Sequence, residues 1–153
     1  MQIVDIGCGD KKFPGSIGVD KNYDEADYKM DIDEENLPFE DNSIDLVVSN
    51  DSIEHMGNPK HVFKEVYRIL KPGGKFRIET VNVSVWWIRL FIFLDWNVAW
   101  RHKIGTKRTG HMIHFTPDML DMWFEMNGFK PLGRKNNFLF RYKITQTGIK
   151  KCD

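Results

Sequence analysis

The 153-residue chain carries 22 Lys and Arg against 22 Asp and Glu, so its formal net charge of zero excludes a global attraction to nucleic acid or to an anionic membrane. Its hydrophobic content of 41% suits one globular domain, which we expect to span residues 1–153. Two cysteines without zinc-type spacing exclude a disulfide framework and predict no metal site. The sequence shows no signal-peptide pattern, which favours a cytoplasmic location.

A short apolar run near the start of the chain ends in an acid and two glycines, with the sequence IVDIGCG at residues 3–9. This pattern predicts a buried parallel strand that breaks into a tight loop at Gly7 and Gly9. Because glycine has no Cβ, such a loop allows a ligand to approach the backbone closely. A dinucleotide-binding fingerprint would place a third glycine where Lys12 stands, so the loop disfavours NAD.

The second apolar run, IGVD at residues 17–20, predicts another short strand. Only residues 10–16 separate the two runs, which is too short for the crossover helix that parallel strands normally need. We therefore expect a shortened connection with one helical turn at most. Asp20 ends the second run, and its two carboxylate oxygens could accept both hydroxyls of a ribose.

The next stretch is acidic, and its centre at residues 28–32 predicts a third, short strand. A turn at residues 41–43 then precedes a β-branched, apolar run at residues 44–48, which predicts a buried parallel strand. Ligands of open α/β sheets bind at the carboxyl ends of strands, so the polar residues 49–51 should face a ligand. His55 follows closely and is a candidate general base, the alternative being a hydrogen bond within the loop.

Two helices have clear start signals. Asn58 and Pro59 begin the first, which ends before the KPGG turn at residues 71–74 and a strand at residues 75–81. Thr116 and Pro117 begin the second, which ends at Gly128. We expect a closing hairpin with strands at residues 129–134 and 138–144.

Three motifs resemble those of class I S-adenosylmethionine (SAM)-dependent methyltransferases of the type 11-like family. They are D-x-G-x-G at residues 5–9, LPFEDNSID at residues 37–45 and RILKPGG at residues 68–74. The resemblance implies an α/β, Rossmann-like three-layer sandwich with a mostly parallel seven-stranded sheet whose last strand is antiparallel. It also implies SAM as the cofactor and S-adenosylhomocysteine (SAH) as the product.

In that family an Asp just after the third strand meets the adenine amino group, and the next backbone N–H meets a ring nitrogen. Asp31, followed by Ile32, and Asp33 both fit this role, and the sequence leaves the choice open. The expected cofactor-binding residues are Asp5, Gly7, Cys8, Gly9, Asp20, Asp31, Ile32, Asp33, Ser49 and Asn50.

Residues 83–115 are expected to form an insertion for substrate binding or for an interface. Four tryptophans fall within residues 83–100, a stretch too interrupted for a membrane span. It is compatible with a lid helix, a homodimer surface, a peripheral helix on a bilayer or a core-packing helix. Residues 101–108 form a basic loop that suits phosphate, carboxylate, RNA or solvent. His111 and His114 follow this loop and are further candidates for a base or for orienting the substrate.

The resulting hypothesis is a SAM-dependent methyltransferase acting on an oxygen or carbon of a small or lipid-linked molecule. No Asn-Pro-Pro-Tyr-type motif follows the strand at residues 44–48, which disfavours amide and exocyclic amine nitrogens. Two alternatives remain: a SAM-binding module that needs a partner or a second copy to act, and an RNA methyltransferase that uses the basic loop.

Overall fold

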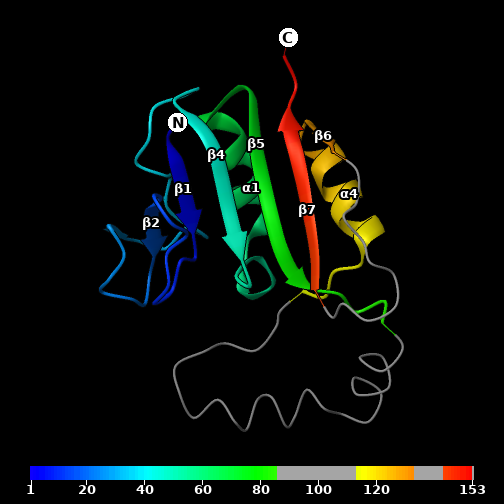
Figure 1. The fold of residues 1–153 in the computed structure, drawn as a ribbon, viewed down its shortest axis with the longest axis horizontal. Coiled ribbons are helices and arrows are strands. Elements are labelled where there is room, and N and C mark those ends of the chain that lie inside the picture. The colour runs from blue at the N-terminus through cyan, green and yellow to red at the C-terminus, as the bar shows by residue number, and fades with distance from the viewer. Residues whose placement is uncertain (86–112, 133–142, 153) are drawn as a thin grey trace, which may run out of the picture.

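The computed structural model describes residues 1–85, 113–132 and 143–152. These residues contain a seven-stranded sheet with the order β3-β2-β1-β4-β5-β7-β6 (Figure 1). Strands β1 to β5 run parallel, whereas β7 is antiparallel to both of its neighbours. The strands are β1 (Ile3–Ile6), β2 (Ile17–Asp20), β3 (Tyr28–Lys29), β4 (Ile44–Asn50), β5 (Leu70–Val81), β6 (Phe129–Pro131) and β7 (Lys143–Lys150). The expected sheet is confirmed.

The helices of the described residues are η1 (Ile53–His55), α1 (Pro59–Ile69) and α4 (Pro117–Met126). Both α-helices begin as predicted: the Asn58 side chain accepts a hydrogen bond from the His61 N–H at 3.3 Å, and Thr116 accepts one from the Met119 N–H at 3.2 Å. Helix α1 ends at Ile69, and β5 starts directly at Leu70, five residues before the predicted start at Lys75. The intervening KPGG turn is accommodated as an irregularity in the pairing with β4.

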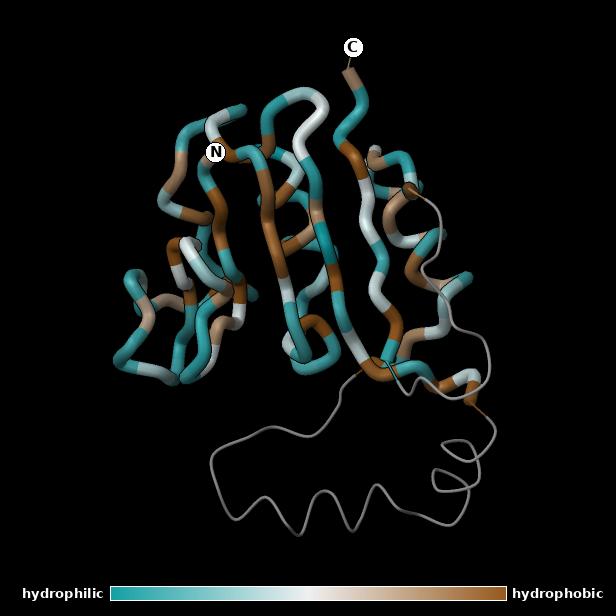
Figure 2. Tube along the Cα trace, viewed as in Figure 1, coloured by the Kyte–Doolittle hydropathy of each residue, from teal (hydrophilic) through white to brown (hydrophobic). Residues whose placement is uncertain are grey.

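Helices α1 and α4 share one face of the sheet and meet there in an aromatic cluster. The ring of Phe63 on α1 lies 5.5 Å from that of Phe124 on α4 and 5.2 Å from that of Phe76 on β5. All three rings are fully buried, and each contributes about 1.5–3 kcal/mol of hydrophobic stabilisation. Figure 2 shows how hydrophobic and hydrophilic residues are distributed along the chain: hydrophobic residues lie on the central strands and hydrophilic ones in the turn after β4.

The opposite face carries no helix within the described part of the chain, and the shortened first connection lies over it. Asp5, Val48 and Arg77 are neighbours across β1, β4 and β5. The Arg77 guanidinium stacks on the ring of Phe13, 5.6 Å from its centre, and Asp5 accepts a hydrogen bond from the Phe13 N–H at 2.7 Å. Residues 10–16 contain turns but no helix, so the prediction of a shortened connection is confirmed.

Two predicted strands differ from the structure. Strand β3 has only two residues instead of five because the chain turns away after Lys29. The predicted strand at residues 138–144 ends too early, because the partner of β6 is β7 at Lys143–Lys150. The first five predicted residues lie outside the described ranges. A Cβ on Gly148 would lie 2.3 Å from the Phe124 ring, so this glycine lets α4 pack directly on β7.

The predictions for residues 83–100 and 101–108 fall almost entirely outside the described residues, which resume at Ile113. Among the helices that the structure describes, none combines the length and the apolar character needed to cross a membrane.

Candidate functional site

The glycine loop follows β1 and is built around backbone conformations that favour glycine. Gly7 has φ +67° and Gly9 has φ +58°. The Gly7 N–H donates to the Val19 carbonyl at 2.8 Å, which attaches the loop to β2. A Cβ on Gly7 would lie only 2.5 Å from the Cβ of Ser52, so this position is restricted by both space and conformation.

Hydrogen bonds of two serine side chains connect this loop to the end of β4. The hydroxyls of Ser49 and Ser52 are 2.6 Å apart, and the Ser52 hydroxyl donates to the Ile6 carbonyl at 2.9 Å. Ser49 is fully buried, so its side chain presents no surface to a ligand in this structure. Its observed contact places it under the loop, where it joins the end of β4 to the end of β1.

Three side chains of the predicted cofactor site meet around the loop. Asp5 is 2% exposed, and burial raises the pKa of its carboxyl, with a smaller rise from Asp20 and a counteracting hydrogen bond from the Phe13 N–H. Asp20 accepts hydrogen bonds from the Gly9 N–H at 3.0 Å and the Asn22 N–H at 2.8 Å. Burial, followed by the charges of Asp5 and Asp20, raises the pKa of the Cys8 thiol to about 11, so it stays protonated and unreactive near neutral pH.

The two candidate adenine partners differ in their contacts. Both carboxylate oxygens of Asp33 accept backbone hydrogen bonds, from Gly57 at 2.9 Å and Asn58 at 3.0 Å, which anchors the start of α1. Asp31 forms an ion pair with Lys21 at 3.1 Å and accepts the Asp33 N–H at 3.1 Å. Ile32 between them packs against the core. The Lys21 contact therefore brings Asp31 next to the end of β2, where Asp20 lies.

Buried oxygens without hydrogen-bond partners gather at one edge of the sheet. Four such side-chain oxygens occur in the described ranges: Asp5 Oδ1, Asn50 Oδ1, Glu54 Oε2 and Thr80 Oγ1. All four belong to residues at or just after the carboxyl ends of β1, β4 and β5. Each unmet buried group costs about 1–3 kcal/mol, and a ligand that supplies hydrogen bonds is one way to recover that cost.

The histidines predicted as bases are only partly placed. His55 lies on η1, and His114 lies in the segment that donates the Ile113 N–H to the Glu54 carbonyl at 3.2 Å. Phe115 forms a parallel bridge with Asn82, just beyond β5. The structure thus brings His55 and His114 to the same edge of the sheet, whereas His111 lies outside the described residues.

The sequence placed Glu54 beside the site without giving it a role and did not single out Thr80. Glu54 is 2% exposed and Thr80 is 1% exposed, so both side chains are buried at the glycine-loop edge. The signal that could have found Glu54 is an acid between the apolar Ile53 and the candidate base His55. No comparable signal distinguished Thr80, because β-strands often contain threonine.

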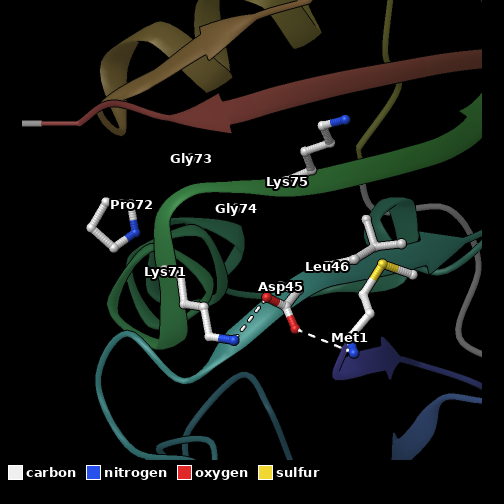
Figure 3. A pocket seen from close by; sticks show the side chains of 8 residues that line it. All are labelled: Met1, Asp45, Leu46, Lys71, Pro72, Gly73, Gly74 and Lys75. Carbon is white, nitrogen blue, oxygen red and sulfur yellow. Dashed lines mark hydrogen bonds and ion pairs between the residues drawn. The ribbon is translucent and has the colours of Figure 1, made fainter.

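A surface depression of about 340 Å³ lies at the other end of the sheet (Figure 3). Its lining includes Asp45, Lys71 and the turn at residues 72–75, and Lys71 forms an ion pair with Asp45 at 2.8 Å. These residues lie near the amino end of β4 and the start of β5, opposite the edge where α/β sheets bind ligands. The candidate site is therefore the glycine-loop edge.

Comparisons with known proteins show which proteins the chain resembles. Residues 14–78 match the model of the methyltransferase domain family. A SAM-dependent methyltransferase from Methanosarcina mazei has a similar structure, with a TM-score of 0.74 at 19% identity over 99% of this chain and 93% of that chain. A chain of the complex between the Haloferax volcanii Trm112 methyltransferase activator and a methyltransferase aligns with a TM-score of 0.66 at 18% identity, over 99% of this chain and 82% of that chain.

A curated relative extends the comparison to sequence. The malonyl-[acyl-carrier protein] O-methyltransferase of Pectobacterium atrosepticum is 24% identical over 130 residues, covering 74% of this chain and 49% of the relative. The chain thus spans about half the length of that relative.

Proposed function

We propose that the chain is a class I SAM-dependent methyltransferase that transfers the methyl group of SAM to an oxygen or carbon of a small or lipid-linked molecule. The observation that carries the proposal is the pair of unmet buried oxygens, Asp5 Oδ1 and Asn50 Oδ1, at the ends of β1 and β4 beside the glycine loop. Acceptor oxygens at this edge suit the hydrogen-bond donors of an amino acid group. The methionine part of SAM carries such donors.

The nucleoside part of SAM would be held at the end of β2. Asp20 is fixed by the Gly9 and Asn22 N–H groups, and a carboxylate has further acceptor capacity for a ribose diol. We assign the adenine contact to Asp31, followed by Ile32, because its ion pair with Lys21 brings it next to the end of β2, whereas Asp33 anchors the start of α1. The glycine loop lets the cofactor lie against the backbone.

SAM supplies an electrophilic methyl group when bound. The task of the protein is then to hold the acceptor in line with that group, since proximity and orientation supply much of the rate enhancement. A proton acceptor is required only where the acceptor atom must lose a proton. His55 and His114, at the same edge, are our candidates for that step.

The experiment is calorimetric titration of the purified protein with SAM and SAH. We expect micromolar binding of both. Asp20→Ala should weaken binding by about 1–3 kcal/mol because ribose donors would lose their acceptor. Asp10→Ala is the matched control, since Asp10 is an exposed acid just beyond the loop. A folded wild-type protein that binds neither compound would contradict the proposal.

A partner-dependent module is the second candidate. The Haloferax volcanii complex supports it, because there a chain of similar fold is associated with a methyltransferase activator. Within the described residues, the sheet face around Asp5, Val48 and Arg77 is also without a covering helix. Size-exclusion chromatography with light scattering tests this candidate, and a monomer with full turnover would rule it out, including the homodimer through residues 83–100.

The remaining expectations carry separate tests. RNA methylation through residues 101–108 predicts that removing the basic charges there weakens RNA binding, and unchanged affinity would exclude it. A lipid-linked acceptor or peripheral membrane contact predicts co-sedimentation with vesicles, which Trp86→Ala and Trp87→Ala should reduce. A cytoplasmic location remains a prediction to be checked by fractionation of the cells that make the protein.

A further inference from the structure

Glu54 and Thr80 lie beyond the proposed cofactor residues. The sheet order places β2, β1, β4 and β5 side by side. The cofactor residues belong to the ends of β2, β1 and β4, whereas Thr80 is the next-to-last residue of β5 and Glu54 lies on η1 after β4. The pair is therefore displaced toward β5 from the residues proposed to hold the cofactor.

The two side chains offer complementary chemistry. Glu54 Oε2 and Thr80 Oγ1 are both buried and neither forms a hydrogen bond of normal geometry, although the Thr80 hydroxyl lies near enough to the Glu54 carboxyl to lower its pKa. A carboxyl oxygen can accept a hydrogen bond, and a threonine hydroxyl can donate one. A ligand hydroxyl both donates and accepts, so one oxygen atom could satisfy both groups. A carboxylate or an ammonium would lose more hydration free energy than a hydroxyl on entering a site whose two oxygens are buried.

Electrostatics also favour a neutral ligand group. Burial raises the pKa of the Glu54 carboxyl, and the charge of Asp51 raises it further, while the nearby Thr80 hydroxyl and His55 lower it. A raised pKa disfavours the charged form of this carboxyl and so weakens its attraction for an ammonium. The Asp51 carboxylate, which forms an ion pair with Lys143, adds no attraction for an anion.

We propose that Glu54 and Thr80 form an acceptor subsite that binds a hydroxyl group of the molecule to be methylated. The inference rests on the proposed function and deepens it by naming a hydroxyl-bearing substrate class. The burial of both oxygens limits the subsite to a small group at the end of the acceptor. Access requires the Ile113–Phe115 segment, which contacts Glu54 through one backbone hydrogen bond, to shift locally.

The test uses three probes of similar shape: benzyl alcohol, benzoate and benzylamine. Each is titrated by NMR into wild-type protein saturated with SAH. We expect benzyl alcohol to bind at least about fivefold more tightly than the other two, the difference that one good hydrogen bond supplies. Thr80→Val and Glu54→Leu should abolish that preference. Thr147→Val on β7 is the matched control and should retain it.

Thermal unfolding separates recognition from a structural role. Thr80→Val removes a buried hydroxyl that forms no hydrogen bond of normal geometry, so the melting temperature should change little. A lower melting temperature together with an unchanged probe preference would overturn the inference, as would equal binding of all three probes, which would indicate a bridging water only. A preference for benzylamine or benzoate would overturn it in favour of an amine or an acid. Failure of SAH to bind would contradict the proposed function instead, and the probes would then be titrated into the ligand-free protein.

Discussion

Lys143, the first residue of β7, forms an ion pair with Asp51, the residue that directly follows β4. Asp51 has φ +48°, a left-handed conformation that costs energy for a residue other than glycine. Its N–H donates to the Glu79 carbonyl at 2.8 Å, and the Glu79 carboxylate lies 3.3 Å from the Lys143 ammonium. The antiparallel strand thus restrains the turn that presents Asn50 to the proposed cofactor.

Replacing Lys143 should therefore weaken cofactor binding indirectly, although we do not expect Lys143 to contact the cofactor. We expect Lys143→Met to raise the dissociation constant of SAM about three- to tenfold, since a partly exposed ion pair contributes up to about 1 kcal/mol and its loss frees a strained turn. Calorimetry measures the change. The rescuing variant is Lys143→Met with Asp51→Gly, because glycine adopts positive φ without a restraint. Affinity that stays low in this double variant would show that Lys143 acts by another route.

Gly7 allows conformational strain to be separated from steric conflict. Gly7→Ala should lower the free energy of unfolding by about 2–4 kcal/mol, because it combines a positive φ with a Cβ placed 2.5 Å from Ser52 Cβ. Gly15→Ala is the control, since Gly15 has φ +75° but nothing within 4 Å of the added Cβ. Urea denaturation should show a clearly smaller loss, about 1–2 kcal/mol, for Gly15→Ala. Equal losses would mean that Ser52 moves aside at no cost.

We expect the Asp5 carboxyl to lower the folding stability at neutral pH and to strengthen SAM binding. Burial raises the pKa of its carboxyl in the folded state, so its contribution to stability is full below the unfolded-state pKa and is lost as the pH rises through the folded-state pKa. Asp5→Asn keeps an acceptor for the Phe13 N–H and should increase the free energy of unfolding at pH 7, with the gain shrinking as the pH falls through the raised folded-state pKa and vanishing below about 4.

The same Asp5→Asn variant should bind SAM more weakly, because the amide has one acceptor oxygen where the carboxylate has two. Unfolding followed at several pH values and calorimetry at pH 7 measure the two effects. Asp10→Asn, at an exposed position, is the control for both. A less stable Asp5→Asn protein at neutral pH would contradict the assigned cost of burial.

Short sequence patterns predicted those parts of the fold that are determined by residues close together in the chain. The glycine loop, the caps at Asn58 and Thr116 and the missing crossover helix all follow from residues close together in sequence. Strand β7 does not follow from residues close together in sequence. Its buried positions include Gln146, Gly148 and Lys150, which become compatible with the interior only through partners distant in sequence. The contact of Ser49 with Ser52 and the burial of Glu54 were equally inaccessible, since each depends on what the fold places around the side chain.

Lys150 gives the clearest test of such a distant partnership. Its ammonium donates to Asn42 Oδ1 and to the carbonyls of Tyr67 and Leu70, each at 2.8 Å, and lies 4.6 Å from the centre of the Tyr67 ring. The two carbonyls lie at the carboxyl end of α1, where helix carbonyls lack internal partners and a cation is favourable. The C-terminal strand thereby closes the end of α1.

Lys150→Met keeps much of the side-chain volume but removes every donor. We expect a loss of roughly 2–3 kcal/mol in the free energy of unfolding, because buried acceptors are left unmet. The exposed neighbour provides the control: Lys151→Met should change stability by less than about 0.5 kcal/mol. SAM affinity should be unchanged in both variants, because Lys150 contacts the start of β5, at the edge of the sheet opposite the glycine loop. Stability equal to that of Lys151→Met would show that these three hydrogen bonds contribute nothing net to folding.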